Sequence, residues 1–244
     1  MNSLYVVDLD TMRYADALEL QRHVAKERIS GKIPEDVLLL VEHPHVVTLG
    51  RSTRLVNLVA SKEQLEARGI ELFDVERGGD VTYHGPGQLV GYPIIDLKRH
   101  KQDLHWYLRQ VEEALIVALR TFGIEGVRQP GYTGVWVETT SPRIPNPQAP
   151  IPEPTPVASR RKLASIGVHA RDWVTWHGFA LNVTTDLSYF DVMVPCGIAD
   201  VTMTSIQREA TLGAPGATIP ETKRLVAEAF ARVFRLEPQA HTLD

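Results

Sequence analysis

A lone thiol is the residue of this sequence best suited to nucleophilic chemistry. Cys196 is the only cysteine among 244 residues, and it lies in a Pro195–Gly197 turn. A single thiol in a turn is a candidate nucleophile, although free cysteine more often behaves as a small, inert, buried hydrophobe. A thiol with an ordinary pKa of about 8.5 is only slightly ionised at neutral pH. A nucleophilic Cys196 therefore needs a nearby cation or base.

Lys162 is the candidate for that cation. It opens a predicted strand that follows a proline-rich segment. Taken alone, a lysine in this position is more often a solvated edge residue than a catalyst. However, the chain has no Cys–His spacing typical of thiol proteases, and both Lys162 and Cys196 lie at junctions between loops and strands. Because side chains from separate strands can meet at such junctions, we take Cys196 and Lys162 as the candidate catalytic pair.

A glycine-rich segment from Arg77 to Gly87 is the candidate binding site, with four glycines in eleven positions. Glycine lets a ligand approach the backbone and leaves amide groups to point at it. The segment matches neither the dinucleotide G-x-G-x-x-G nor the phosphate-loop G-K-[ST] pattern. Two tight turns would explain the glycines but not the titratable groups among them. The predicted binding residues here are Arg77, Gly78, Gly79, Asp80, Val81, Thr82, Tyr83 and His84.

Histidines raise the alternative of a metal site. His43, His45, His84, His169 and His177 are numerous, but there is no C-x-x-C, no H-E-x-x-H and no H-x-E paired with C-x-x-C. These are the spacings on which zinc sites usually rest. We therefore predict no metal, and we expect His43 and His45, which flank Pro44, to be structural or solvent-facing.

Composition bounds the class of protein. A chain of 27.2 kDa with a net charge of −4 and a pI near 6.1 has no global electrostatic reason to bind nucleic acid or anionic lipid. One cysteine excludes an intramolecular disulfide, no apolar run approaches membrane-spanning length, and the first residues lack a signal-peptide pattern. We expect a cytoplasmic protein with no nucleic-acid or membrane partner.

Hydrophobic periodicity predicts an α+β fold in which helices pack on a mixed or mostly antiparallel sheet. Helices are expected from about Ala17 to a stop at Gly31, after a capping box at Ser61, from Asp103 to Phe122, and after Thr218. The third helix is predicted to bury a stripe that includes Leu104, Leu108 and Val111. Strands are expected at 5–9, 37–41, 46–49, 70–75, 81–83, 89–97, 132–138, 163–171 and 179–184.

The segment from Thr139 to Ser159 contains too many prolines for a helix or an interior strand. We interpret it as a solvated, polyproline-like insertion at about 139–160 rather than a recruitment site, since no aromatic or basic anchor repeats within it. The chain is otherwise expected to form a single domain over residues 1–244, because its length suits one large core.

Together these motifs resemble the lipoyl (octanoyl) transferases, which belong to a cofactor transferase family shared with lipoate and biotin protein ligases. The resemblance spans most of the chain. The segments that carry it are 40–44, 48–51, Arg77 to Pro93, Lys162 to His169, Gly178 to Val183, Pro195 to Ile198 and Val201 to Ile206. The proline-rich segment departs from the usually compact pattern, but it precedes the lysine strand and should leave the site intact.

The resemblance implies a biotin/lipoate-ligase-like catalytic domain and an acyltransferase reaction. An octanoyl group would pass from octanoyl-acyl carrier protein to Cys196 as a thioester, and then to a lysine on the lipoyl domains of 2-oxoacid dehydrogenase E2 subunits and on the glycine cleavage H protein. Lys162 would lower the thiol pKa or shuttle its proton. No cofactor is expected, because thioester-to-amide transfer is downhill and needs no nucleotide. The further binding residues implied are Ser165, Ile166, Gly167, Gly178, Phe179 and Ala180.

Two alternatives remain at this stage. An ATP-dependent lipoate or biotin ligase on the same scaffold would adenylate a free carboxylate and use a lysine without a thiol nucleophile, which the Pro195–Gly197 turn disfavours. A non-catalytic protein that binds lipoyl domains would leave Cys196 inert.

Overall fold

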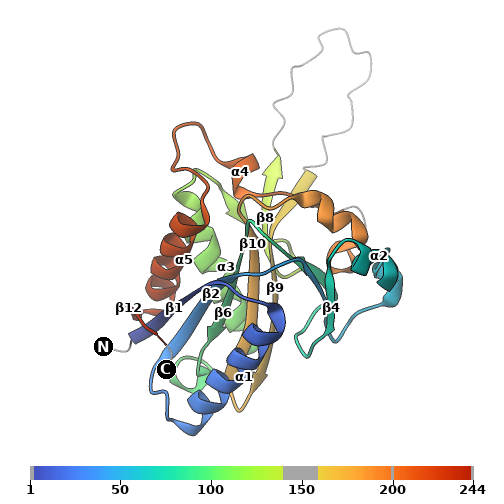
Figure 1. Ribbon diagram of the computed structural model, residues 1–244. Helices are drawn as coiled ribbons and strands as arrows, with labels where there is room; N and C mark the ends of the chain where they lie inside the picture. The colour runs from blue at the N-terminus through green and yellow to red at the C-terminus, as the bar shows by residue number, and fades with distance from the viewer. Residues whose placement is uncertain (1–2, 140–158, 199–200, 243–244) are drawn as a thin grey trace.

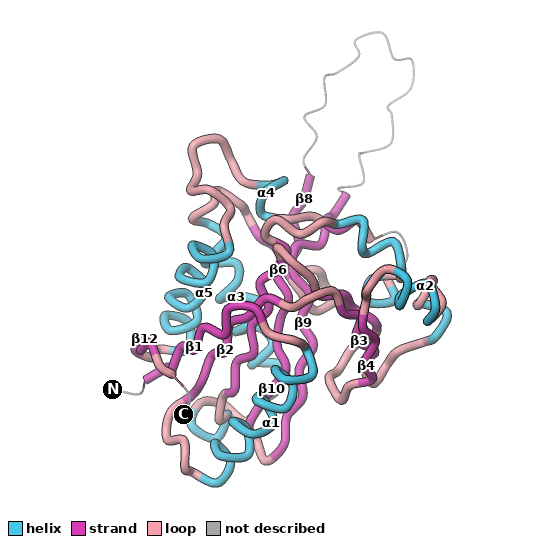
Figure 2. The backbone as a smooth tube through the Cα atoms, in the orientation of Figure 1, coloured by secondary structure: helices cyan, strands magenta, loops and turns pink. Residues whose placement is uncertain are grey.

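The computed structural model describes residues 3–139, 159–198 and 201–242, which form a large mixed sheet, a small sheet and helices on both faces of the large one (Figures 1 and 2). The proline-rich insertion predicted at about 139–160 falls almost entirely outside these residues, as do Met1, Asn2 and the last two positions. The predicted α+β class with a mixed sheet is confirmed. Within the described residues, no helix has both the length and the apolar character needed to cross a membrane.

The large sheet has the strand order β12-β1-β2-β6-β10-β9-β8-β7, and β11 pairs with β9. β1 is parallel to both β2 and β12, and β11 is parallel to β9, whereas the other pairs are antiparallel. The strands of this sheet are β1 (Ser3–Thr11), β2 (Asp36–Glu42), β6 (Gln88–Ile94), β7 (Gly126–Val127), β8 (Val135–Thr139), β9 (Ser159–Arg171), β10 (Val174–Asn182), β11 (Thr202–Met203) and β12 (Glu237–Ala240).

The small sheet has the order β4-β3-β5, with β3 parallel to β4 and antiparallel to β5. Its strands are β3 (Val46–Leu49), β4 (Glu71–Asp74) and β5 (Val81–His84). The sequence predicts two strands joined by a tight turn around Pro44, and both strands exist. They do not pair, however, because the chain leaves the large sheet after β2 and enters the small one at β3. This crossing places the glycine-rich segment over the large sheet.

Helices cover the two faces of the large sheet. The helices and helical turns are α1 (Tyr14–Ser30), α2 (Lys62–Ala67), α3 (Leu104–Arg120), α4 (Ile206–Glu209), α5 (Ile219–Phe234) and the 3-10 turns η1 (Leu55–Asn57), η2 (Leu97–Arg99), η3 (Leu187–Val192) and η4 (Pro195–Gly197). α3 and α5 pack on one face around Phe230 and Leu115, and α1 packs on the other around Val24. Burying these apolar faces is the main stabilisation of the fold.

Local signals placed the helix ends well. Ser61 forms the predicted capping box with Gln64, Gly31 adopts a left-handed conformation at the end of α1, and the Thr218 hydroxyl accepts the Glu221 amide at the start of α5. Strand ends were less well predicted. The strand expected at 89–97 stops at Ile94, because the Asp96 carboxylate accepts the Lys98 amide and starts η2.

The predicted burial stripe of α3 is wrong at its N-terminal end. Val111, Leu115 and Leu119 are buried as expected, but Leu104 is 40% exposed and Leu108 is only partly buried. Both side chains line a pocket instead. The first turns of α3 therefore contribute to a cavity wall rather than to the core.

Candidate active site

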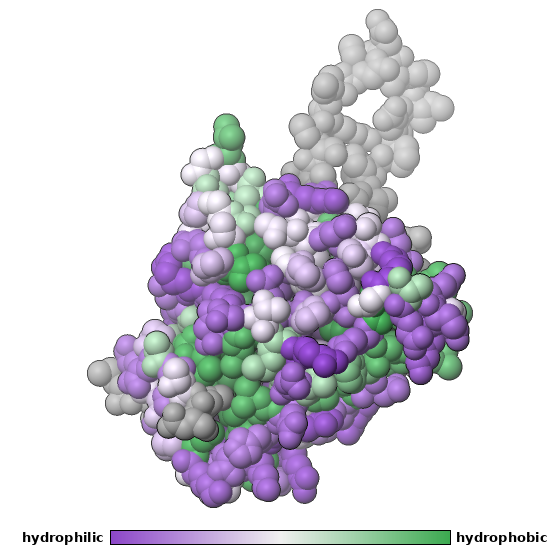
Figure 3. Space-filling model, viewed as in Figure 1, coloured by the Kyte–Doolittle hydropathy of each residue, from purple (hydrophilic) through white to green (hydrophobic). Residues whose placement is uncertain are grey.

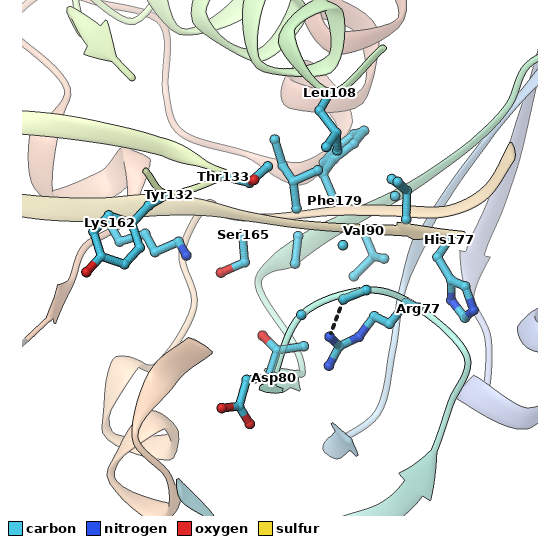
Figure 4. Close-up of a pocket in the computed structure, with 18 of the residues that line it drawn as sticks. Arg77, Asp80, Val90, Leu108, Tyr132, Thr133, Lys162, Ser165, His177 and Phe179 are labelled. Atoms are coloured by element: carbon cyan, nitrogen blue, oxygen red, sulfur yellow. Dashed lines mark hydrogen bonds between the residues drawn. The ribbon is translucent and has the colours of Figure 1, made fainter. Parts of the chain in front are cut away.

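A cavity of about 480 Å³ lies where the glycine-rich segment crosses the middle of β6, β10 and β9, and the first turns of α3 also line it. Its volume is typical of sites for small ligands. In Figure 4, Lys162 and His177 lie at opposite ends of the drawn residues, with Ser165, Val90 and Phe179 between them. The lining is mainly apolar in its middle, where Val90, Phe179 and Leu108 contribute. Such a cavity can bury a short acyl chain.

Most of the predicted binding residues line this cavity. Those that do are Arg77, Gly78, Gly79, Asp80, Thr82, His84, Ser165, Ile166, Gly167, Gly178, Phe179 and Ala180. Val81 and Tyr83 do not line it, because successive side chains of a strand point to opposite faces. Their side chains pack in a separate apolar cluster on the far side of β5.

Arg77 fixes the glycine-rich segment to the small sheet. Its guanidinium donates to the Thr48 carbonyl at 2.8 Å and to the Thr48 hydroxyl at 2.9 Å, and it also donates to the Gly78 carbonyl (Figure 4). The next residue bridges to the large sheet, since the Gly78 amide donates to the Val168 carbonyl at 2.9 Å. The amide of Gly78 is therefore used within the protein.

Gly167 allows this close approach, and Gly178 allows a close approach of the neighbouring strand β6. The two glycines face each other across β9 and β10. A methyl group on Gly167 would lie 2.7 Å from the Gly78 carbonyl oxygen, and one on Gly178 would lie 2.1 Å from the Gly91 carbonyl oxygen. Only residues without Cβ fit these positions, which explains why glycines from distant parts of the sequence meet here.

Lys162 is not the solvated edge residue that its position in the sequence suggests. It lies inside β9 between β8 and β11, is 1% exposed, and lines the cavity. Its Nζ lies 5.1 Å from the centre of the Trp136 ring, which is itself 3% exposed. A cation over a buried aromatic face is held by the ring quadrupole. The structure thus places a buried lysine amine at one end of the cavity.

An irregularity in the sheet produces this contact. Val135 pairs with Ala164, but Trp136 pairs with Lys162, so the register shifts by one residue between them. Such a bulge re-aims side chains at the strand where it occurs. Gly134 also makes room, since a Cβ there would lie 2.9 Å from the Lys162 Cε. Trp136 and Gly134 are not among the predicted site residues, because no local feature of the sequence indicates the strand register.

Asp80 joins the glycine-rich segment to the turn that carries Cys196. One carboxylate oxygen accepts the Val81 amide, and the other accepts the side-chain amide of Asn57 at 2.5 Å. Gly197 lies against both, since a Cβ on it would be 2.5 Å from the Asp80 Oδ2 and 2.8 Å from the Asn57 Nδ2. Its φ of 64° also favours glycine.

The backbone of Cys196 forms the middle of η4, and Ile198, which follows this turn, lines the cavity near Asp80. The side chain of Cys196 lies outside the part of the chain that the structure describes. The pairing of Cys196 with Lys162 therefore stays a prediction, although Lys162 and the residue after the turn share one cavity.

Neutral, buried histidines form the polar end of the cavity region. His84 donates from Nδ1 to the side-chain amide oxygen of Gln88, and burial lowers its pKa to about 3. His43, behind it, donates from Nδ1 to the Met12 carbonyl and accepts the Tyr92 hydroxyl, and burial lowers its pKa to about 4. Both imidazoles are uncharged at neutral pH.

No cluster of three or more histidine, cysteine or acidic side chains within the described residues is arranged to hold a metal ion. His43 is structural, as expected. His45 hydrogen-bonds to the Tyr83 hydroxyl and stacks on Tyr189, so it too has a structural role.

Comparison with known proteins agrees with this geometry. The model of the lipoyl protein ligase A/B catalytic domain matches residues 13–231. An octanoyltransferase of Solibacter usitatus is 46% identical over 237 residues, which cover 97% of this chain and 96% of that protein. An octanoyltransferase of Gloeobacter violaceus is 40% identical over 244 residues, covering 100% and 96% of the two chains.

Solved structures extend the comparison at the level of the fold. A bipartite lipoate protein ligase from Thermoplasma acidophilum superposes with a TM-score of 0.70 at 15% identity, covering 100% of this chain and 88% of that one. A lipoate-protein ligase A bound with ATP gives a TM-score of 0.69 at 16% identity, with coverage of 100% and 90%. At these identities the likeness concerns the fold alone.

Proposed function

We propose that Cys196 carries an octanoyl group as a thioester during the reaction of this protein. The chain belongs to the family of lipoyl protein ligase A/B catalytic domains, and it is an acyltransferase that moves octanoyl groups in protein lipoylation. In the first step, the Cys196 thiolate attacks the carbonyl carbon of an octanoyl thioester. The bond between the carbonyl carbon and the donor sulfur breaks, the donor sulfur takes up the Cys196 proton carried by Lys162, and a new thioester forms on Cys196. In the second step, a lysine amine of the acceptor attacks this thioester, an amide forms, and the Cys196 thiol is regenerated.

The observation that supports this proposal most strongly is the buried side-chain amine of Lys162 in the same cavity as Ile198, next to the Cys196 turn. An ammonium beside a sulfur favours the thiolate. A lysine that has given up its proton can then accept one from the incoming amine. We therefore assign Lys162 the role of activating Cys196 and of moving its proton.

The cavity suits the acyl chain that the reaction requires. Val90, Phe179, Ala180 and Leu108 supply apolar walls between the Lys162 end and the histidine end. Burial stabilises a bound chain by about 0.8 kcal/mol per methylene. The donor is proposed to be octanoyl-acyl carrier protein, and the acceptors are lipoyl domains, with the glycine cleavage H protein among those proposed.

No nucleotide enters either step. The first step exchanges one thioester for another, so its free-energy change is small. The second step converts a thioester into a more stable amide, so it is favourable without further activation. This distinguishes the proposal from an ATP-dependent ligase on the same fold, which must first activate a free carboxylate.

The intact mass of the protein tests the proposal. After incubation with octanoyl-acyl carrier protein and without ATP, we expect one octanoyl adduct on Cys196 that hydroxylamine removes. Cys196→Ser is the matched control, and it should form no hydroxylamine-labile adduct and lose turnover. Use of free octanoate only in the presence of ATP, with no adduct on Cys196, would assign the chain to the ligases instead.

A further inference from the structure

An apolar and basic stretch of surface lies in the connection between β3 and α2. Residues 50–62 contain Arg51, Arg54 and Lys62 but no aspartate or glutamate, although the chain as a whole has 30 acidic and 26 basic residues. Arg51 and Arg54 are exposed, and so are three large aliphatic side chains between them and α2. We call the exposed side chains of Arg51, Arg54, Leu55, Val56 and Val59 the η1 surface.

The apolar part of the η1 surface is unusually open to solvent. Leu55 is 75% exposed, Val56 is 79% exposed and Val59 is 65% exposed. Among the described residues, seven large apolar side chains are exposed, and three of them lie within residues 55–59. Figure 3 shows hydrophobic surface at the edge of the molecule beside α2. Clustered exposed apolar groups flanked by charge are typical of protein-binding sites.

Backbone hydrogen bonds attach one end of this segment to the rim of the cavity. The Arg51 amide donates to the Arg77 carbonyl at 3.0 Å, and the Ser52 amide donates to the Gly79 carbonyl at 3.1 Å. Gly79 lines the cavity. The arginine end of the η1 surface therefore borders the site directly.

The other end is attached to η3 and to the short connection between η3 and the Cys196 turn. The Val194 amide donates to the Asn57 carbonyl at 2.7 Å, and the Val59 amide donates to the Val192 carbonyl at 2.9 Å. The Asn57 side chain also reaches Asp80, beside Gly197. A protein that covered the η1 surface would thus sit immediately next to the Cys196 turn.

We propose that the η1 surface is the docking site for the acceptor lipoyl domain, which would meet it with an apolar patch bordered by carboxylates. This inference rests on the proposed function and names the partner surface for its second step. A lysine side chain is short, so the domain that carries it must lie directly against the residues around Cys196. Leu55, Val56 and Val59 supply the apolar contact, and Arg51 and Arg54 attract an acidic partner and orient it.

The test separates docking from chemistry. Octanoyl-enzyme is prepared from wild-type protein, Val56→Glu and Arg54→Glu with a small thioester, octanoyl-N-acetylcysteamine. Each acyl-enzyme is then mixed with a lipoyl domain or with Nα-acetyl-lysine, and loss of the octanoyl mass is followed. Leu212→Glu is the matched control, because Leu212 is an exposed leucine in the loop between α4 and α5.

We expect both η1-surface variants to raise the lipoyl-domain concentration for half-maximal transfer about tenfold, as the loss of an interface anchor typically does. Transfer to Nα-acetyl-lysine should match the wild type, and so should acylation by octanoyl-acyl carrier protein, which is measured separately. Leu212→Glu should change none of these reactions. Wild-type transfer to the lipoyl domain should also slow as salt is added.

Unchanged half-maximal concentrations in both variants would overturn the assignment. A defect confined to acylation by acyl carrier protein would also overturn it, because the η1 surface would then bind the donor protein. An equal loss of transfer to Nα-acetyl-lysine would overturn it too, because it would indicate damage to the Cys196 turn. Failure of the wild-type protein to form any acyl-enzyme would refute the proposed function itself. This result differs from the three outcomes above, in all of which the wild-type protein forms an acyl-enzyme.

Discussion

Replacing Trp136 by leucine should slow acylation of Cys196 without changing any group that reacts. The Lys162 Nζ lies 5.1 Å from the centre of the Trp136 ring, and both side chains are almost fully buried. A desolvated cation–π contact contributes about 2 kcal/mol. If the ring holds Lys162 in its working position, losing that contact slows acylation by about 30-fold, since about 1.4 kcal/mol corresponds to a factor of ten.

The assay is single-turnover acylation by octanoyl-acyl carrier protein, read as intact mass against time. Trp136→Phe is the matched control, because it also removes volume but keeps an aromatic face, and it should lose less than about tenfold. Thermal unfolding of both variants measures the cost of the smaller side chain, which we expect to be similar in the two. Equal rates for the leucine and phenylalanine variants would refute the argument that the aromatic face positions Lys162.

Three further predictions concern other parts of the site. Lys162→Ala should shift the alkylation of Cys196 by iodoacetamide to higher pH and slow acylation, and an unchanged pH profile would remove Lys162 from the mechanism. Gly167→Ala places a methyl group 2.7 Å from the Gly78 carbonyl oxygen. It should lower the unfolding free energy by about 1–3 kcal/mol and reduce activity. Gly216→Ala is the control, because a methyl group there meets open space, and it should change neither quantity. His43 has a pKa of about 4 in the folded protein and of 6.5 in the unfolded chain. Because the unfolded chain binds the extra proton, the unfolding free energy should fall by about 3 kcal/mol between pH 6.5 and 4. Denaturant titrations in which His43→Phe shows the same dependence of unfolding free energy on pH would contradict this.

The helix starts and the glycine-rich segment could be predicted from the sequence, because they depend on residues close together in the chain. The capping box at Ser61 and the hydroxyl cap at Thr218 depend on residues three positions apart, and both helices begin where these residues predict. The glycine-rich segment was also recognisable, because glycines beside titratable groups are rarely explained by turns alone. Twelve of the fourteen predicted binding residues line the cavity, the exceptions being Val81 and Tyr83 on the opposite face of β5.

What the sequence did not reveal depends on contacts between distant segments. Leu108 fits the apolar stripe of α3, but only the position of β9 and the glycine-rich segment decides that it faces a cavity rather than the core. Lys162 looked like an edge residue, since nothing near it in sequence announces that β8 and β11 flank it or that a register shift brings it over Trp136. The short parallel strand β12, with Pro238 in it, is likewise defined by its partner β1 alone.

The central claim is that octanoyl transfer proceeds through a thioester on Cys196, and a chase of the isolated octanoyl-enzyme tests it most directly. The acylated protein is freed of donor and mixed with a lipoyl domain in the absence of nucleotide. We expect the octanoyl mass to leave Cys196 and to appear on the lipoyl-domain lysine at the same rate. An adduct that persists while the lipoyl domain is acylated by fresh donor would contradict it, because the lysine would then be attacking the donor directly.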